Sequence, residues 1–239
     1  MTIEDKLLQF ENNQILDRDS LYQLIRETHP KYKDTSIRWV IYDLVKKGMI
    51  SKISQKKYVI GKSNIFSQKN SSDERLKIVS FLEEKFPNIK IVVYESTLLN
   101  EWVNHQIARK IIFIEVEKYF MNDVFRSIYN HFRTRVMLNP DKDELYLYQG
   151  ELIIVTQLIT QAPINLKTKD IKIEKLIVDL YTKDLINEFV NDDEKEKVIE
   201  DIFKAYTVNL KSIYAYAKRR NNTDLMKKIL SSIEHGGLT

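Results

Sequence analysis

The sequence predicts an α+β protein in which a small N-terminal unit precedes a larger mixed α/β domain. Residues 29–61 run from a polar turn through a helical pattern to two short alternating segments. From residue 74 to residue 158 strand-like runs alternate with helical ones, and after residue 172 the helical period dominates. Elements that segregate along a chain in this way are typical of an α+β fold with a helical C-terminal region.

The first 62 residues have the pattern of a winged helix-turn-helix. Residues 3–12 and 19–28 predict amphipathic helices, and a polar turn leads to a third helix. The third helix places five apolar side chains on one stripe: Ile37, Val40, Ile41, Leu44 and Val45. Gly48 follows as an expected helix C-cap. Residues 49–53 and 57–60 then alternate as the strands of a hairpin, the wing.

The polar stretch 63–74 predicts a linker, followed by a second domain over residues 75–239. Helical patterns cover residues 74–84, 96–105, 122–132, 172–189, 193–220 and 223–234. Strand patterns cover residues 89–94, 110–117, 135–138, 144–148 and 152–158. The second domain is therefore expected to combine a sheet with a helical C-terminal region.

The excess positive charge lies in the N-terminal unit. The chain has a net charge of +4, and its first 62 residues contain 12 basic and 8 acidic side chains, whereas the other 177 contain 26 of each. Between Thr28 and Lys62, nine lysine or arginine residues accompany only two acidic ones. A basic patch confined to one unit is the electrostatic pattern of nucleic-acid binding, so double-stranded DNA is the expected partner.

The residues expected to bind DNA lie on the third helix, the turn before it and the hairpin. They are Lys33, Thr35, Ser36, Arg38, Trp39, Lys52, Gln55, Lys56 and Lys57. The lysines are expected at phosphates, which fix register without reading sequence. The start of the third helix is expected in the major groove. Arg38 is the expected base reader there, because its planar fork matches the O6 and N7 atoms of guanine.

Two alternatives remain open for this unit. Small helical units with a hairpin also serve as protein-interaction modules, although the charge asymmetry favours DNA. Trp39 lies beside the apolar stripe, where a tryptophan often packs against the first helix or the linker.

An enzymatic alternative is a metal-dependent nuclease. Glu95 ends one predicted strand, and Glu115 and Glu117 end the next, which is where restriction-type nucleases hold Mg²⁺. The lysine of the usual E-x-K pattern is one position late, at Lys118, so these acids also fit solvated strand ends. The five glycines are scattered, and the four histidines have no metal-ligand spacing. Neither a catalytic residue nor a metal or other cofactor is expected.

For the charged and aromatic residues near the C-terminus, a structural role is favoured over a role in binding. Lys218, Arg219 and Arg220 end a predicted helix, where cations complement the helix dipole. A second phosphate contact or a patch facing a protein partner is the alternative for these cations. Tyr206, Tyr214 and Tyr216 predict helix packing rather than a base-stacking platform.

Two stretches of the second domain resemble a known family. The runs VVYESTLLNEWVNHQIARKIIFIEVEKYFMNDVFRSI and APINLKTKDIKIEKLIVDLY look like the C-terminal part of AbiEi-like antitoxins of type IV toxin–antitoxin systems. In that family a winged helix precedes such a domain, and the resemblance covers residues 10–190. It implies a bacterial antitoxin, active in abortive phage infection, that represses its own operon. It also implies a nucleotidyltransferase-like toxin as partner and no catalytic residue.

Composition sets the remaining expectations. The chain has no cysteine, which excludes disulfides and thiolate metal sites. No apolar run approaches the roughly 20 residues that span a bilayer, and the N-terminus lacks a signal-peptide pattern. A cytoplasmic protein without a membrane partner is expected. The alternative to the antitoxin is a winged-helix regulator whose second domain senses a small ligand.

Overall fold

The computed structural model describes residues 2–10, 14–53, 56–61, 64–68, 71–148, 150–183, 186 and 189–236. The chain divides into two compact units, residues 1–66 with 200–211 (unit 1) and residues 67–199 with 212–239 (unit 2). It combines helices with three sheets, as an α+β fold should. Residues 64–68 and 71–72 of the predicted linker form no helix or strand, and the linker itself stays a prediction.

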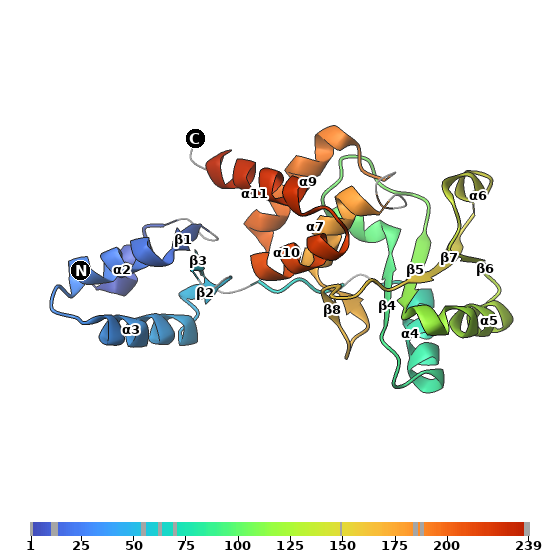
Figure 1. The fold of residues 1–239 in the computed structure, drawn as a ribbon, viewed down its shortest axis with the longest axis horizontal. Helices are drawn as coiled ribbons and strands as arrows, with labels where there is room; N and C mark the ends of the chain where they lie inside the picture. Colours follow the sequence, from blue (N-terminus) through green and yellow to red (C-terminus); the bar gives the residue numbers. More distant parts are fainter. Residues whose placement is uncertain are drawn as a thin grey trace. The chain divides into compact units, whose positions relative to one another are not determined.

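Unit 1 begins with helices and a three-stranded antiparallel sheet (Figure 1). The elements are α1 (Ile3–Leu7), β1 (Ile15–Asp17), α2 (Arg18–Thr28), α3 (Asp34–Lys46), β2 (Ile50–Lys52) and β3 (Lys57–Ile60). The central strand is β3, which pairs with β1 on one side and β2 on the other. The sequence did not predict β1, a strand of three residues that runs directly into the N-cap of α2, Asp17.

The core of unit 1 is built from one face of each helix and the facing side of the sheet. Its buried residues are Ile3, Leu7, Leu21, Ile25, Ile37, Ile41, Leu44, Ile50, Tyr58 and Ile60. The predicted stripe on α3 is confirmed for Ile37, Ile41 and Leu44, but it is wrong for Val45, which is 39% exposed. Val45 stands eight residues after Ile37, and that spacing turns it about 80° away around a helix.

Unit 2 is organised around a four-stranded sheet with the order β4-β5-β7-β6. The strands are β4 (Ile91–Glu95), β5 (Ile111–Val116), β6 (Arg135–Leu138) and β7 (Leu152–Gln157). β4 runs antiparallel to β5, whereas β5, β7 and β6 run parallel to one another. A small sheet of β8 (Ile164–Asn165) and β9 (Asp170–Ile171) follows.

Helices cover both faces of this sheet. The remaining helical elements of the chain are α4 (Asp73–Lys85), η1 (Ser96–Glu101), η2 (Lys118–Phe120), α5 (Met121–His131), α6 (Lys142–Tyr146), α7 (Ile173–Thr182), α9 (Asp192–Ala205), α10 (Leu210–Arg219) and α11 (Thr223–Gly236). The end of α9 and the start of α10, residues 200–211, belong to unit 1. Buried residues of α4 and α5 pack on the face that carries Val93, Ile114 and Val155. The opposite face of the sheet packs against α7, where Lys175 reaches Glu115. Figure 1 shows α7 and α10 on one side of the sheet and α5 on the other.

Several predicted elements of the sequence are wrong in type or length. The predicted strand 144–148 is the helix α6, whose capping box pairs Asp141 with Glu144 at each other's backbone N–H. The predicted helix 172–189 ends as α7 at Thr182, where Lys183 is extended. The predicted helix 193–220 is interrupted between α9 and α10. The first helix, predicted over 3–12, ends at Leu7.

Candidate functional site

The outer face of α3 carries the first candidate site. Thr35, Arg38, Trp39, Tyr42 and Lys46 are all exposed, and their spacing of three or four residues puts them on one side of the helix. The buried stripe of Ile37, Ile41 and Leu44 fixes this orientation, because it holds the opposite side of α3 in the core. We call these five residues the α3 outer face. Of the predicted DNA-binding residues, Ser36 is half-buried and lies at its border.

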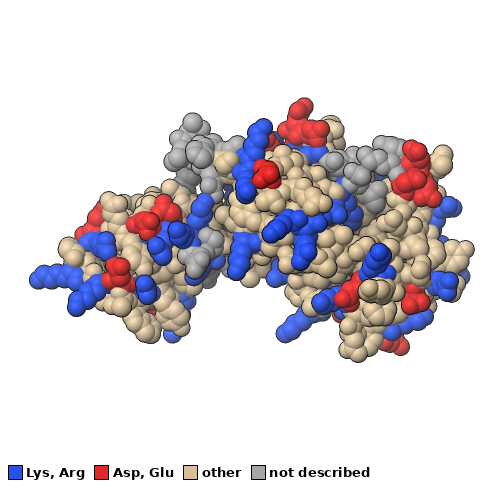
Figure 2. All heavy atoms as spheres, in the orientation of Figure 1, with Lys and Arg blue, Asp and Glu red and all other residues tan. Residues whose placement is uncertain are grey.

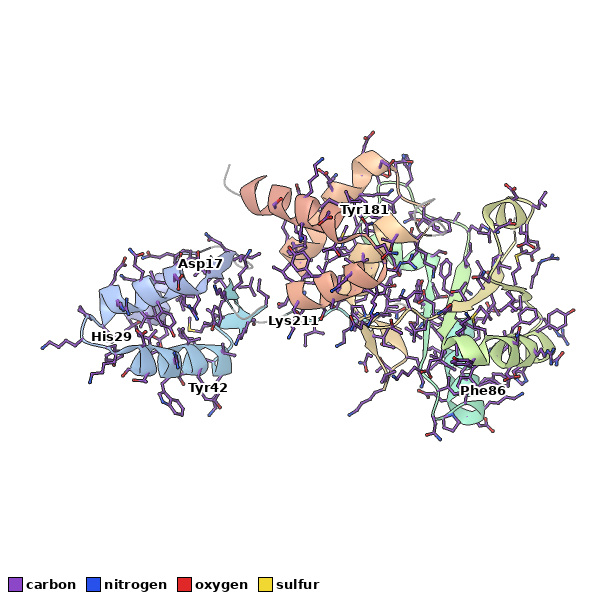
Figure 3. All side chains as sticks on the ribbon, in the orientation of Figure 1. Asp17, His29, Tyr42, Phe86, Tyr181 and Lys211 are labelled. Atoms are coloured by element: carbon purple, nitrogen blue, oxygen red, sulfur yellow. The ribbon has the colours of Figure 1, made fainter. Side chains whose placement is uncertain are left out.

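Two aromatic side chains stand out on the α3 outer face. Trp39 is 72% exposed and Tyr42 is 60% exposed, and their rings meet edge to face with centroids 5.8 Å apart. Tyr42 lies on the side of α3 that faces away from α2 (Figure 3). The expectation that Trp39 packs against the first helix or the linker is therefore wrong. Tyr119 and Leu147 are exposed even more fully, so it is the pairing of two adjacent rings on one helix face that favours a surface for a partner.

Local ion pairs remove acidic charge from this part of unit 1. Asp34 binds Arg26 at 2.7 Å, and Asp43 binds Lys47 at 2.7 Å. Glu4 also binds Lys47, at 3.0 Å, and that contact lowers the pKa of Glu4 below its ordinary value. Each acid of α3 is thus paired with a cation outside the α3 outer face, and Asp43 and Glu4 share one cation, Lys47.

Several cations of unit 1 are left without such a pair. Within the described ranges, no ion pair involves Lys31, Lys33, Arg38, Lys46 or Lys52. Blue basic side chains are visible over unit 1 in Figure 2, with red acidic ones between them. The unpaired cations give the turn before α3, the α3 outer face and β2 a positive surface.

The hairpin contributes the remaining predicted residues. Lys52 is exposed near the end of β2, Lys56 is exposed, and Lys57 begins β3 half-buried. Gln55 lies outside the described residues. The structure therefore brings the predicted residues together in two groups of one unit, the α3 side with the turn before it, and the hairpin.

A buried charge cluster in unit 2 forms the second candidate site. Glu115, at the end of β5, accepts three hydrogen bonds on its Oε1 atom. The donors are the Tyr94 hydroxyl at 2.7 Å, Lys175 Nζ at 2.9 Å and Lys183 Nζ at 2.6 Å. The interpretation of Glu115 as a solvated strand-end acid is wrong, because its side chain is buried among these partners.

Asp179 forms the other half of the cluster. It receives hydrogen bonds from Lys175, one helical turn earlier on α7, and from the Tyr216 hydroxyl of α10 at 2.9 Å. Lys175 therefore bridges two buried carboxylates. The two carboxylates and the two lysines balance in charge. This balance is what makes such deep burial of ions tolerable.

The environment shifts the pKa values of the cluster in opposite directions. Burial alone would raise the pKa of Glu115, but the charges of Lys175 and Lys183 outweigh it and hold that pKa below its ordinary value. Burial would lower the pKa of Lys175, but Asp179 and Glu115 raise it above the ordinary lysine value. For Lys183 burial dominates, so its pKa is lowered. Burial together with Glu115 raises the pKa of Tyr94.

The two other predicted strand-end acids do not join this cluster. Glu95 is paired opposite Ile112, so it lies on the face that α4 covers, whereas Glu115 lies on the opposite face. Glu95 is buried and accepts hydrogen bonds from the Ser72 backbone N–H at 3.0 Å and hydroxyl at 2.6 Å. Glu117 accepts one from the Lys90 N–H at 3.2 Å. In the described ranges, no three His, Asp or Glu side chains gather as a metal-ligand set.

A cleft with a volume of about 520 Å³ opens beside the charge cluster. Its walls are formed by Glu115, Asn139, Pro140, Asp141, Thr156, Gln157, Ile159, Asp179, Thr182, Lys183, Tyr216 and Arg220. Glu115, Thr156 and Asn139 mark the carboxyl ends of the parallel strands β5, β7 and β6. In open α/β sheets this edge is where ligands bind.

Arg220 was predicted as a cation at a helix end, and the structure also places it in the wall of the cleft. It follows α10, as its predicted place at a helix end requires, but its side chain is half-buried in the cleft wall. Its Nε donates to the Thr182 hydroxyl at 2.9 Å and its Nη2 to the Thr182 carbonyl. The sequence signal for the cluster was present in Lys175 and Asp179, two charges one turn apart within an otherwise apolar helical run.

Comparison with known proteins adds a family. Residues 36–235 match a family of unknown function, DUF6577. A search of the curated proteins found no match. In the described part of the chain, no helix has the length and apolar character needed to cross a bilayer.

Proposed function

The chain belongs to DUF6577, a family of unknown function, and we propose that it is a sequence-specific DNA-binding regulator of transcription. The observation that carries this proposal is the α3 outer face. It presents Arg38, which forms no ion pair among the described residues, together with two exposed aromatic rings. The acids of α3, Asp34 and Asp43, are each paired with a cation that lies off this face. The proposal implies a protein that works on the chromosome in the cytoplasm.

The architecture of unit 1 supports a winged helix-turn-helix. Its elements follow the order α1, β1, α2, α3, β2, β3, and the sheet order β1-β3-β2 places the hairpin strands side by side. α2 and α3 are joined by a short turn, residues 29–33, as in helix-turn-helix proteins. On this proposal α3 is the recognition helix, and the loop between β2 and β3 is the wing.

In the proposed interface, some residues position the protein on the DNA backbone and others read the base sequence. Lys33, Lys52, Lys56 and Lys57 bind phosphates, and Gln55 is the further wing residue expected from the sequence to bind DNA. Arg38 reaches a guanine edge, with Thr35 and Ser36 beside it at the start of α3. Trp39 offers an apolar surface for a thymine methyl group or a sugar, a role that suits an exposed ring on a groove-facing helix.

Binding to defined and random DNA tests the proposal. A pool of random duplexes is selected on the full chain, and the enriched duplex is compared with a scrambled one by fluorescence anisotropy at several salt concentrations. We expect the enriched duplex to bind at least about 1,000-fold more tightly than the scrambled one. If no duplex is enriched and binding does not fall with salt, the protein-interaction alternative for unit 1 replaces the DNA proposal.

An antitoxin role is a narrower proposal, and it rests on the resemblance to AbiEi-like antitoxins. Its partner is a nucleotidyltransferase-like toxin encoded next to this gene, and its operator is the promoter of that pair. Co-expression tests it: the full chain is expected to restore growth of cells that express the neighbouring gene product, whereas residues 1–66 alone are not. If neither restores growth, the regulator lacks the antitoxin role and the DNA-binding proposal stands unaffected.

The nuclease alternative draws little support from unit 2. Glu95 and Glu115 face opposite sides of the sheet, and both are occupied by hydrogen bonds within the protein. Incubation of DNA with the protein and Mg²⁺ decides the matter, since the proposal expects the DNA to remain intact.

A further inference from the structure

We propose that the cleft of unit 2 is a binding site for a small polar anion, whose phosphate or carboxylate group is held by Arg220 and Lys183. This inference does not depend on DNA binding by unit 1.

The topology opens a crevice at the cleft. After β5 the chain enters α5, which packs on the face of the sheet carrying Ile114. After β7 the chain leads through β8 and β9 to α7, on the opposite face, where Lys175 meets Glu115. β5 and β7 are neighbouring parallel strands. Their chains therefore leave the same edge toward opposite faces, which defines a topological switch point, the usual ligand site of such sheets.

Three cations and three acids lie in or behind the cleft wall, and Arg220 is the cation that is not paired with an acid among the described residues. The lysines Lys175 and Lys183 neutralise Glu115 and Asp179. Arg220 is half-buried, and its hydrogen bonds to described residues go to the two oxygen atoms of Thr182, both uncharged. Among the described residues no carboxylate forms an ion pair with it. Asp141, the remaining acid of the cleft wall, is exposed to water and is already engaged as the N-cap of α6.

The unused capacity of the two cations consists of donors. A guanidinium has five N–H groups, and Arg220 directs two of them at Thr182. An ammonium has three, and Lys183 directs two at Tyr94 and Glu115. The groups left over are free to donate to acceptor oxygens, and phosphate and carboxylate supply such oxygens with matching charge and geometry.

The other walls mix hydrogen-bonding groups with apolar surface. Asn139, Thr156 and Gln157 offer amide and hydroxyl groups, whereas Pro140 and Ile159 are the apolar members. A cleft of about 520 Å³ falls within the range of small-molecule sites. The site thus fits a small hydroxylated or amide-bearing anion better than a fatty acid or an aromatic hydrocarbon.

Titration of the full chain with simple anions tests the site. Isothermal titration uses inorganic phosphate for the phosphate source and succinate for the carboxylate source, with glycerol as a neutral control. We expect one of the two anions to bind with a dissociation constant of about 1 mM or lower and glycerol not to bind. The anion that binds identifies the group. If neither anion binds up to about 10 mM, the proposal is overturned.

Variants and a labelling measurement locate the bound anion. Arg220→Gln is expected to weaken binding at least about tenfold, whereas Lys167→Gln, an exposed lysine between β8 and β9, retains it. In the wild-type chain the bound anion should slow modification of Arg220 by phenylglyoxal, followed by peptide mass spectrometry, but not that of exposed Arg126. This second measurement decides the question even if Arg220→Gln does not fold. Equal labelling rates with and without the anion would place it elsewhere and refute the proposal.

Discussion

Lys175 and Asp179 form an ion pair one turn apart on α7, and both side chains are buried. The pair lies on the helix face that meets β5, so Lys175 also reaches Glu115. A charged pair buried against a sheet stabilises a protein only while all its partners are present, because each ion has given up its hydration.

The first expectation concerns loss of one ion of the cluster. Glu115→Gln leaves Lys175 and Lys183 with one carboxylate instead of two, and we expect the free energy of unfolding of unit 2 to fall by about 3–5 kcal/mol. Urea denaturation followed by circular dichroism measures this fall. Glu117→Gln is the matched control, since Glu117 accepts a single hydrogen bond from Lys90, and its effect should stay below about 1 kcal/mol. Equal effects of the two substitutions would contradict a structural role of the cluster.

The second expectation concerns pH. The folded-state pKa of Glu115 is lowered, so its carboxylate contributes stability that is complete above its ordinary pKa and is lost as the pH falls through the folded value. The wild-type chain should therefore lose more stability than Glu115→Gln on going from pH 7 to below pH 4.5. Thermal melts of both proteins across this range measure the difference. Parallel losses would show that Glu115 is not ionised in the fold.

The third expectation separates the two sides of α3. Trp39 is largely exposed, so Trp39→Ala should change stability by less than about 0.5 kcal/mol while weakening DNA binding. Leu44 is buried in the core of unit 1, and Leu44→Ala should cost about 2–5 kcal/mol. Chemical denaturation and anisotropy titrations on the same samples compare the two. A strongly destabilised Trp39→Ala protein would mean that the ring packs inside the fold.

The fourth expectation concerns Arg38. Arg38→Ala should cost about 1–3 kcal/mol on the enriched duplex and much less on the scrambled one. Arg38→Lys keeps the charge but lacks the planar fork, so it should retain affinity for scrambled DNA and still lose the preference for the enriched duplex. Equal losses on both duplexes for Arg38→Ala would identify Arg38 as a phosphate contact.

The fifth expectation concerns phosphate contacts. Lys33→Ala combined with Lys52→Ala should weaken binding to both duplexes and reduce the slope of log K against log salt by about one to two. The control removes two exposed lysines of α11, Lys227 and Lys228, and should leave the slope unchanged. An unchanged slope in the Lys33 and Lys52 double variant would remove these lysines from the interface.

The helical period of the apolar residues predicted the helices that bury one side. The stripe of α3 locates its core face, and its outer face follows from the same period. Short elements were predicted less well, because local hydrogen bonds decide them. Residues 144–148 alternate like a strand, yet the capping box of Asp141 and Glu144 makes the segment helical.

The cleft could not be predicted in the same way. Lys175 and Asp179 signal a buried pair, but the sequence does not show that Glu115 and Tyr216 complete it. These residues meet only when β5 pairs with β7 and α10 closes over the sheet. Tyr216 was accordingly predicted to pack between helices, which its burial supports. Its hydroxyl also donates a hydrogen bond to Asp179.

The charge balance of Glu115, Lys175, Asp179 and Lys183 also constrains how this sequence can drift over evolutionary time. Replacement of any one of the four by an apolar residue leaves a buried ion without a partner of opposite charge. Replacement of all four by apolar side chains of similar volume leaves no buried ion. The four positions are therefore expected to vary as a block. Relatives of this chain should keep the whole quartet or lack all of it, and intermediate forms should be rare.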